Sequence, residues 1–138
     1  ATLRFAEGQN AVAADLFERA LAISRELAAD NPDDESAQLD YAQSLAWLAD
    51  AKERLGELDA ATAERTQEAA ILEAMLRRNG ENRSAQLALV TSRRAQSRIA
   101  LARGDTAAAR QHGSAAAVLA RELTRADPAN ADWMAFLI

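Results

Sequence analysis

An all-α fold made of antiparallel helix pairs is predicted by three features of the sequence: few turn-forming residues, an alanine-rich composition and an internal repeat. The 138 residues include two prolines and five glycines. About a quarter of the residues are alanine, which has the highest intrinsic helix propensity. Gly8, Gly56 and Gly104 recur at an interval of 48 residues, a length typical of stacked helical units that share one core. The sequence therefore predicts a right-handed α-α superhelix, a solenoid of about three repeats.

The same interval sets the boundaries of the units. Positions in register include Asn31, Asn79 and Asp127, then Pro32, Gly80 and Pro128. We expect a single domain over 1–138, with complete units at 37–84 and 85–132 and partial units at 1–36 and 133–138. Because the end units are partial, we expect a piece of a longer protein whose exposed apolar ends favour homo-oligomer formation.

Helices are expected at 10–30, 35–55, 59–78, 83–103 and 106–126, with partial helices at both ends. The first carries apolar residues at three- and four-residue spacing and begins at Asn10, a suitable N-cap. This set is Ala13, Leu16, Phe17, Ala20, Leu21, Ser24 and Leu27. The second has the corresponding set Leu39, Ala42, Leu45, Ala46, Leu48, Ala49 and Leu55.

The last three helices lie between the two breaks that recur in each period, one at the glycine and one at the asparagine-containing turn. Asp34, Asn82 and Asn130 occupy one repeat position just after that turn. Their side chains can accept hydrogen bonds from the free amides of the helix that follows.

Composition excludes several classes of function. With 16 basic and 21 acidic residues and a net charge of −5, neither a nucleic acid nor an anionic membrane surface is expected as the main partner. The absence of cysteine removes zinc fingers and thiol nucleophiles. The apolar stretches are far shorter than the roughly 20 residues that span a bilayer. The compartment stays open, with the cytoplasm as the preferred expectation.

The repeat resembles the tetratricopeptide repeat family, in an elongated form that is similar to bacterial helical-repeat scaffolds. In the first unit Gly8, Ala13, Phe17 and Ala20 match the family's glycine, small, aromatic and small positions, and Asn31-Pro32 supplies the closing turn. In the second unit Gly56 and Ala61 match, but Arg65 and Glu68 stand at the aromatic and small positions. The third unit keeps Gly104, Ala109 and Ala116, with Gly113 at the aromatic position.

This resemblance implies a non-enzymatic protein-interaction scaffold that binds a peptide or a partner helix in a concave groove, lined by the first helix of each pair. The lining positions transfer to Gln43, Ala46, Trp47, Asp50, Glu53 and Arg54, and to Thr91, Arg94, Ala95 and Arg98. The carboxylate-binding set of the chaperone-binding members is not supported, because Ala46 and Asp50 occupy two of its positions. The alternative is a regulatory or self-assembly segment of a larger signalling enzyme.

Arg93, Arg94, Arg98 and Arg103 form the most distinctive cluster of charge. One interpretation is a cationic patch in the groove that binds the carboxylates of an acidic peptide or a phosphorylated segment. The other, which we prefer, is internal pairing of Arg94 or Arg98 with Asp50 or Glu53 on the neighbouring helix.

The remaining candidates have plain structural interpretations beside the functional ones. Trp47 suits a binding anchor, although a packed helix–helix contact is preferred, and Trp133 is expected in the core of a following unit. His112 has no second histidine or cysteine to complete a metal site, so it is expected at the surface or the core edge. No combination of nucleophile, base and oxyanion donors is recognised, and we expect no enzymatic activity, no metal and no cofactor.

Overall fold

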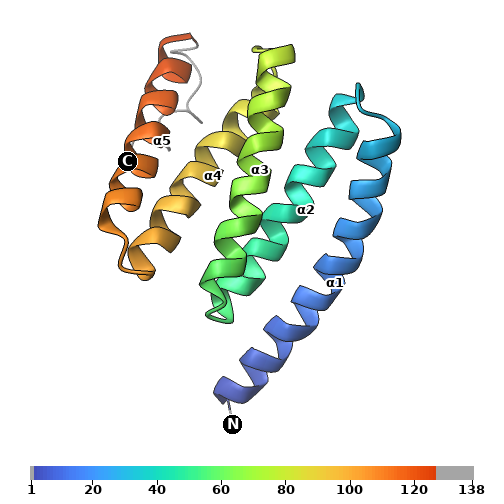
Figure 1. Ribbon diagram of the computed structural model, residues 1–138, viewed down its shortest axis with the longest axis vertical. Coiled ribbons are helices and arrows are strands. Elements are labelled where there is room, and N and C mark those ends of the chain that lie inside the picture. The colour runs from blue at the N-terminus through green and yellow to red at the C-terminus, as the bar shows by residue number, and fades with distance from the viewer. Residues whose placement is uncertain (1, 127–138) are drawn as a thin grey trace.

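Five helices follow one another along the chain, and each packs against the next. The computed structural model describes residues 2–126. The helices are α1 (Thr2–Asp30), α2 (Glu35–Arg54), α3 (Leu58–Arg78), α4 (Arg83–Ala102) and α5 (Thr106–Ala126). Consecutive helices run in opposite directions (Figure 1). No strand occurs in residues 2–126, so the predicted all-α class is confirmed.

The last four helices begin and end within one residue of the predicted bounds, but the start of the first was predicted wrongly. Helix α1 begins at Thr2 and runs through Gly8 and Asn10, so Asn10 does not cap it. A glycine inside a helix costs only about 0.5–1 kcal/mol relative to alanine. Residues 2–7 contain no proline, and nothing in the local sequence ends the helix there.

The turns after α2 and α4 explain why glycine recurs there. Gly56 and Gly104 have φ angles of 79° and 81°, a region that side chains with a Cβ rarely adopt. The Gly56 N–H donates to the Glu53 carbonyl oxygen at 3.0 Å, and the Glu57 N–H donates to the Lys52 carbonyl oxygen at 2.9 Å. This pair of bonds is the Schellman motif, which satisfies the last carbonyl groups of a helix.

The predicted N-caps of α2 and α4 are confirmed. Asp34 Oδ1 accepts hydrogen bonds from the amides of Ser36 and Ala37 at 2.9 and 3.3 Å, and Asn82 Oδ1 accepts one from the amide of Ala85 at 3.0 Å. Asp105 caps α5 in the same way, a role that the sequence analysis did not assign. Asn130 and Trp133 lie outside the described residues.

Three clusters of buried side chains form a core that continues from α1 to α5. The first is Leu21, Leu45 and Leu48, the second is Ala42, Ala69, Leu72, Met75, Ala85 and Leu89, and the third is Val90, Ala120 and Leu123. Ile71 packs against the first and second clusters, and Leu119 packs against the second and third. Successive helix pairs therefore share one apolar core, as the repeat predicted.

The alternate helices are unequally spaced. The backbone of α2 comes close to that of α4, whereas in residues 2–126 the backbones of α1 and α3, and those of α3 and α5, stay farther apart. The side of the stack that carries α2 and α4 is therefore the more compact one. None of the described helices combines the length and the apolar character that a membrane span requires.

Candidate functional site

The predicted groove residues lie on α2 and α4, the two alternate helices that contact each other. The exposed members are Gln43, Trp47, Arg54, Thr91, Arg94 and Arg98, whereas Asp50 and Glu53 are half-buried. Ala46 and Ala95 were transferred to the same surface, but they are buried between the helices. Two of the ten transferred positions therefore belong to the packing of the stack and not to a binding surface.

Four of the predicted residues surround one hollow. Asp50, Glu53, Arg54 and Arg98 line a volume of about 250 Å³ where α2 faces α4. Two carboxylates and two guanidinium groups meet there, so the hollow is polar and close to neutral. Gln43 and Thr91 do not line it, and the Thr91 hydroxyl donates to the Leu87 carbonyl oxygen of its own helix at 3.1 Å.

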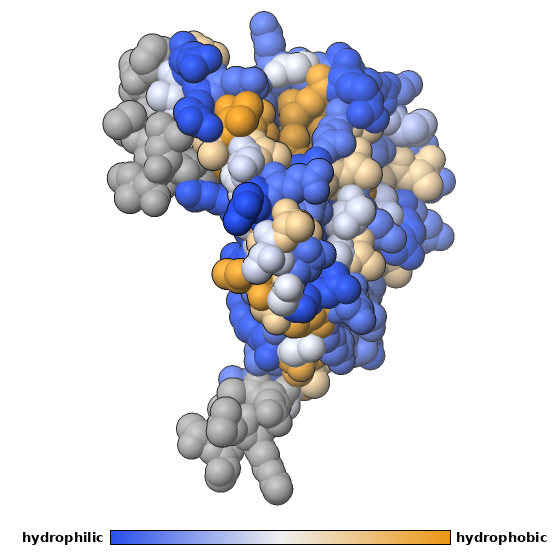
Figure 2. Space-filling view, turned by 60° about the vertical axis from the view of Figure 1, so that its left-hand side comes forward, coloured by the Kyte–Doolittle hydropathy of each residue, from blue (hydrophilic) through white to orange (hydrophobic). Residues whose placement is uncertain are grey.

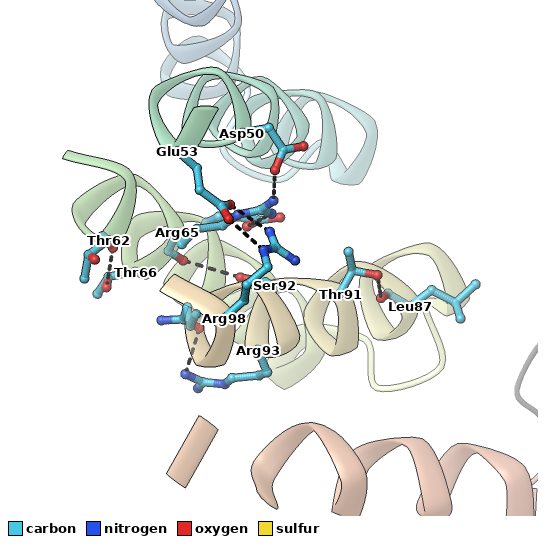
Figure 3. A network of polar contacts seen from close by, with 12 residues as sticks. Asp50, Glu53, Thr62, Arg65, Thr66, Leu87, Thr91, Ser92, Arg93 and Arg98 are labelled. Carbon is cyan, nitrogen blue, oxygen red and sulfur yellow. Dashed lines mark hydrogen bonds and ion pairs between the residues drawn. The ribbon is translucent and has the colours of Figure 1, made fainter. Parts of the chain in front are cut away.

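Arg98 and Glu53 form a bidentate ion pair across the hollow (Figure 3). Arg98 Nε donates to Glu53 Oε2 at 2.7 Å, and Arg98 Nη2 donates to Glu53 Oε1 at 2.8 Å. The hydrogen bonds from Arg98 lower the pKa of the Glu53 carboxyl, and the same bonds raise the pKa of Arg98. The preferred interpretation of internal pairing is thus confirmed for Arg98.

Beneath the hollow lies a buried ionic network that the sequence analysis did not assign to a site. Arg65 of α3 donates through Nη2 to Asp50 Oδ1 at 2.7 Å and through Nη1 to Glu68 Oε1 at 2.9 Å. The relative exposures of Arg65 and Glu68 are both 3%. The Ser92 hydroxyl of α4 lies within hydrogen-bond reach of two acceptors, the Arg65 carbonyl oxygen at 3.5 Å and the Glu68 carboxylate, and its single proton serves one of them at a time. The network therefore joins α2, α3 and α4.

Burial dominates the electrostatics of this network. Desolvation raises the pKa of Glu68, although Arg65 and Ser92 act in the opposite direction. Arg65 Nε has no hydrogen-bond partner among the described residues. An unpaired buried donor costs about 1–3 kcal/mol, so the arrangement is costly and depends on its two ion pairs.

The sequence contained a signal for this network. Arg65 and Glu68 interrupt an apolar face of α3 that includes Ala61, Ala69 and Leu72, all buried. Charged residues three positions apart on a buried helix face are rarely tolerated unless they pair. Their opposite charges and spacing predict such a pair, whereas the contribution of Asp50 depends on the packing of α2 against α3.

The arginine cluster does not form a single patch. Arg93 binds Glu73 on α3 and also donates to Gln96 Oε1 at 3.3 Å, while Arg103 pairs with Asp59 at 2.8 Å. These two guanidinium groups reach from α4 toward α3, away from the carboxylates of α2. Of the cluster, only Arg98 lines the hollow, and Arg94 is exposed on α4.

Trp47 makes the helix–helix contact that was preferred for it, and it is also exposed. Its ring centroid lies 5.9 Å from that of Phe17 on α1, with an interplanar angle of 34°. The side chain nevertheless remains 47% exposed. Since Asp50 follows three residues later on the same helix, Trp47 presents an aromatic surface on the same side of α2 as the charged hollow.

His112 lies at the core edge of α5, half-buried. Burial lowers its pKa, and the positive charge of Arg93 acts in the same direction. Over residues 2–126 no three histidine, aspartate or glutamate side chains converge as metal ligands would.

Comparisons with family models, with curated proteins and with solved structures found no match to the chain. The site is therefore interpreted from its own residues.

Proposed function

We propose that the chain is a non-enzymatic protein-interaction module with the architecture of a tetratricopeptide-like solenoid. Three observations support this: Gly56 and Gly104 make equivalent turns at equivalent repeat positions, consecutive helix pairs share one core, and the backbones of α2 and α4 lie closer together than those of α1 and α3 or of α3 and α5. A stack with this unequal spacing curves toward α2 and α4. The first helices of the pairs then line the concave side.

The module binds a peptide or partner helix with acidic side chains against α2 and α4. The observation that carries this proposal is the exposed Trp47 beside the hollow that Arg54 and Arg98 line. Tryptophan and arginine are enriched among the residues that contribute most to protein interfaces. A ligand carboxylate has to replace Glu53 on Arg98, and such exchange is feasible because the Arg98 side chain is 56% exposed. The ligand gains its net affinity from Arg54 and Trp47.

The test uses a set of glutamate-rich peptides and the fluorescence of Trp47. Trp133 is first replaced (Trp133→Phe), so that the signal comes from one tryptophan. Peptides are titrated into this variant and into a second one that also carries Arg94→Glu and Arg98→Glu. We expect saturable binding to the first and at least a tenfold loss in the second, since each lost charged hydrogen bond contributes about 1.5–3 kcal/mol.

A matched control changes charge by the same amount elsewhere. Arg77 and Arg110 are exposed residues of α3 and α5, and the pair Arg77→Glu and Arg110→Glu should leave peptide affinity unchanged. Equal losses in both double variants would show that only net charge matters, and the proposed groove would be wrong. No binding by any acidic peptide would also contradict the proposal.

The alternative is a regulatory or self-assembly segment of a larger signalling enzyme. One observation favours self-assembly. Val12, Leu16, Ile23 and Leu27 of α1 are between 54% and 62% exposed. Four large apolar side chains on one helix are more than the scattered exposure normal for a soluble surface. They lie on α1, away from the charged hollow, and can be tested separately.

A further inference from the structure

Helix α1 carries an apolar stripe that no other described helix covers. The stripe consists of Val12, Leu16, Ala20, Ile23 and Leu27, which recur at three- and four-residue spacing and so share one face of the helix. The neighbouring stripe of α1, with Leu21 and Ser24, is buried against α2. Helix α1 therefore has two apolar stripes, of which one is occupied.

The repeat shows that this face is normally an interior one. Leu27 corresponds to Met75 of α3 and Leu123 of α5; Leu27 is 54% exposed, whereas the other two are 4% and 6% exposed. Ile23, at 62% exposure, corresponds to Ile71, which packs into two core clusters. In α3 and α5 these positions are covered by the preceding antiparallel helix.

A hollow beside the stripe fits the same interpretation. It measures about 400 Å³ and lies between α1 and α2, with Ala20, Ile23 and Leu27 among its lining residues. The corresponding place between α3 and α4 is filled, since Leu39 and Ala42 of α2 pack there with Met75 and Leu89. The α1 side of the hollow is thus apolar, whereas its α2 side and the turn carry Asp34, Ser36 and Asp40, and a helix that lies antiparallel on α1 can place apolar side chains over the α1 side.

We propose that the occupant is α1 of a second copy of the chain, bound antiparallel about a two-fold axis near Ala20. This arrangement places Leu16 of one copy opposite Ile23 of the other, and Val12 opposite Leu27, so every large residue of the stripe has an apolar partner. Such self-complementarity is the requirement of a two-fold interface. The small Ala20 side chains meet at the centre and allow the helix axes to approach closely.

The arrangement also places Leu16 and Val12 of the second copy over the hollow, because their partners Ile23 and Leu27 line it. The dimer continues the alternating direction of the helices. Across the two-fold axis the order is α2 and α1 of one copy, then α1 and α2 of the other. Asp15 and Arg19 border the stripe and neutralise each other through an ion pair at 3.2 Å. On the face in Figure 2, by contrast, hydrophobic residues form small groups within a mainly hydrophilic surface.

This proposal does not depend on peptide binding by α2 and α4. Sedimentation equilibrium measures the mass of the wild-type chain, of a Leu16→Glu/Ile23→Glu variant and of a Leu101→Glu/Val118→Glu control. Leu101 and Val118 are 62% and 48% exposed, on α4 and α5, so the control introduces the same charges at similarly exposed sites. We expect twice the monomer mass for the wild type and the control, and the monomer mass for the α1 variant. Circular dichroism checks that all three keep the same helix content.

The chain contains no cysteine, so a single introduced cysteine tests directly whether the two-fold axis lies near Ala20. Ala20→Cys should form a disulfide-linked dimer under mild oxidation, whereas Val118→Cys should remain largely monomeric on a non-reducing gel. A monomeric wild type would overturn the proposal, as would loss of association in the control variant alone. Chains longer than dimers would also overturn it, because they indicate head-to-tail contact between unlike ends.

Discussion

Replacing Arg65 with methionine should destabilise the fold far more than replacing Arg98 in the same way. The Arg65 side chain is 4% exposed and pairs with Glu68, also 4% exposed, whereas Arg98 is 56% exposed. Removing one partner of a buried ion pair costs about 3–5 kcal/mol because the other charge stays buried. Removing one partner of a surface pair costs about 1 kcal/mol or less.

The loss of stability in Arg65→Met arises mainly because Glu68 keeps a buried charge without its partner. Asp50, the second partner of Arg65, has a side chain that is 39% exposed, so water can solvate it when the guanidinium group is removed. Glu68 has no such access to water. A double variant, Arg65→Met with Glu68→Leu, removes both buried charges and should regain most of the loss, since apolar replacements of buried pairs are often neutral or stabilising.

Urea denaturation followed by circular dichroism measures these differences as shifts in the free energy of unfolding. Arg98→Met is the matched control. If Arg65→Met cost no more than Arg98→Met, the assignment of a buried network would be refuted. The penalty should also shrink at acidic pH, because protonated Glu68 no longer requires a cation beside it.

Three further predictions concern the turns, a cap and the pH profile. Gly56→Ala should lower the free energy of unfolding by about 1–2 kcal/mol, because Gly56 has a left-handed φ of 79°. Gly8→Ala, inside α1, should raise the free energy of unfolding by about 0.5–1 kcal/mol. Equal shifts of the melting temperature in the two variants would contradict both assignments. Asp34→Ala removes the acceptor of two amide hydrogen bonds and should cost about 1 kcal/mol in urea denaturation. Asp33→Ala beside it should cost less, because Asp33 forms only an exposed ion pair with Arg78. Because burial raises the pKa of Glu68 above its ordinary 4.5, the native state binds its proton more tightly than the unfolded state, and stability falls as pH rises from the unfolded to the folded pKa. Glu68→Gln should flatten that part of the stability profile, and an unchanged profile would show that another group causes it.

The helix bounds could be predicted from the sequence because their determinants are local. Asp34 and Asn82 cap the helices that follow them, and Gly56 supplies a left-handed turn, whatever packs nearby. The start of α1 could not be predicted from the repeat alone. Gly8 occupies the repeat position of Gly56, but it takes a helical conformation, so that position permits a turn and does not impose one.

The site was less predictable because its contacts depend on packing. The pairing of Arg98 with Glu53 could be anticipated, since the repeat places both residues on neighbouring parallel helices. Ala46 and Ala95 were wrongly assigned to the surface, because the family's lining positions do not specify how closely α2 approaches its neighbours here. The partners of Arg93 lie on α3 and α4. They could not be predicted from the sequence, because they depend on how α4 is rotated about its axis.

One repeat position shows why a pattern match does not determine packing. Phe17, Arg65 and Gly113 are equivalent in the sequence, yet Phe17 stacks on the exposed Trp47 and Arg65 enters a buried network. Gly113 lets Ser97 approach so closely that an added Cβ would lie 3.3 Å from the Ser97 hydroxyl oxygen. That hydroxyl donates to the Ala109 carbonyl oxygen at 2.6 Å. The three equivalent residues thus make contacts of different chemistry, Phe17 with the helix that follows its own and the other two with the helix that precedes theirs.

The buried network also makes the stack less tolerant of misalignment than its alanine-rich faces would be. Alanine and leucine surfaces can slide by one helical turn and still bury similar area, because hydrophobic burial is non-directional. Arg65 makes both of its ion pairs only when Asp50 of α2 and Glu68 of its own helix lie on either side of it, with Ser92 of α4 beside them. A slip of one turn between α2 and α3, about 5.4 Å, separates Arg65 from Asp50 and leaves a buried guanidinium group short of a partner. The buried charges lower the stability of the core, but they favour one register of α2, α3 and α4. That register aligns Glu53 with Arg98 at the proposed binding surface.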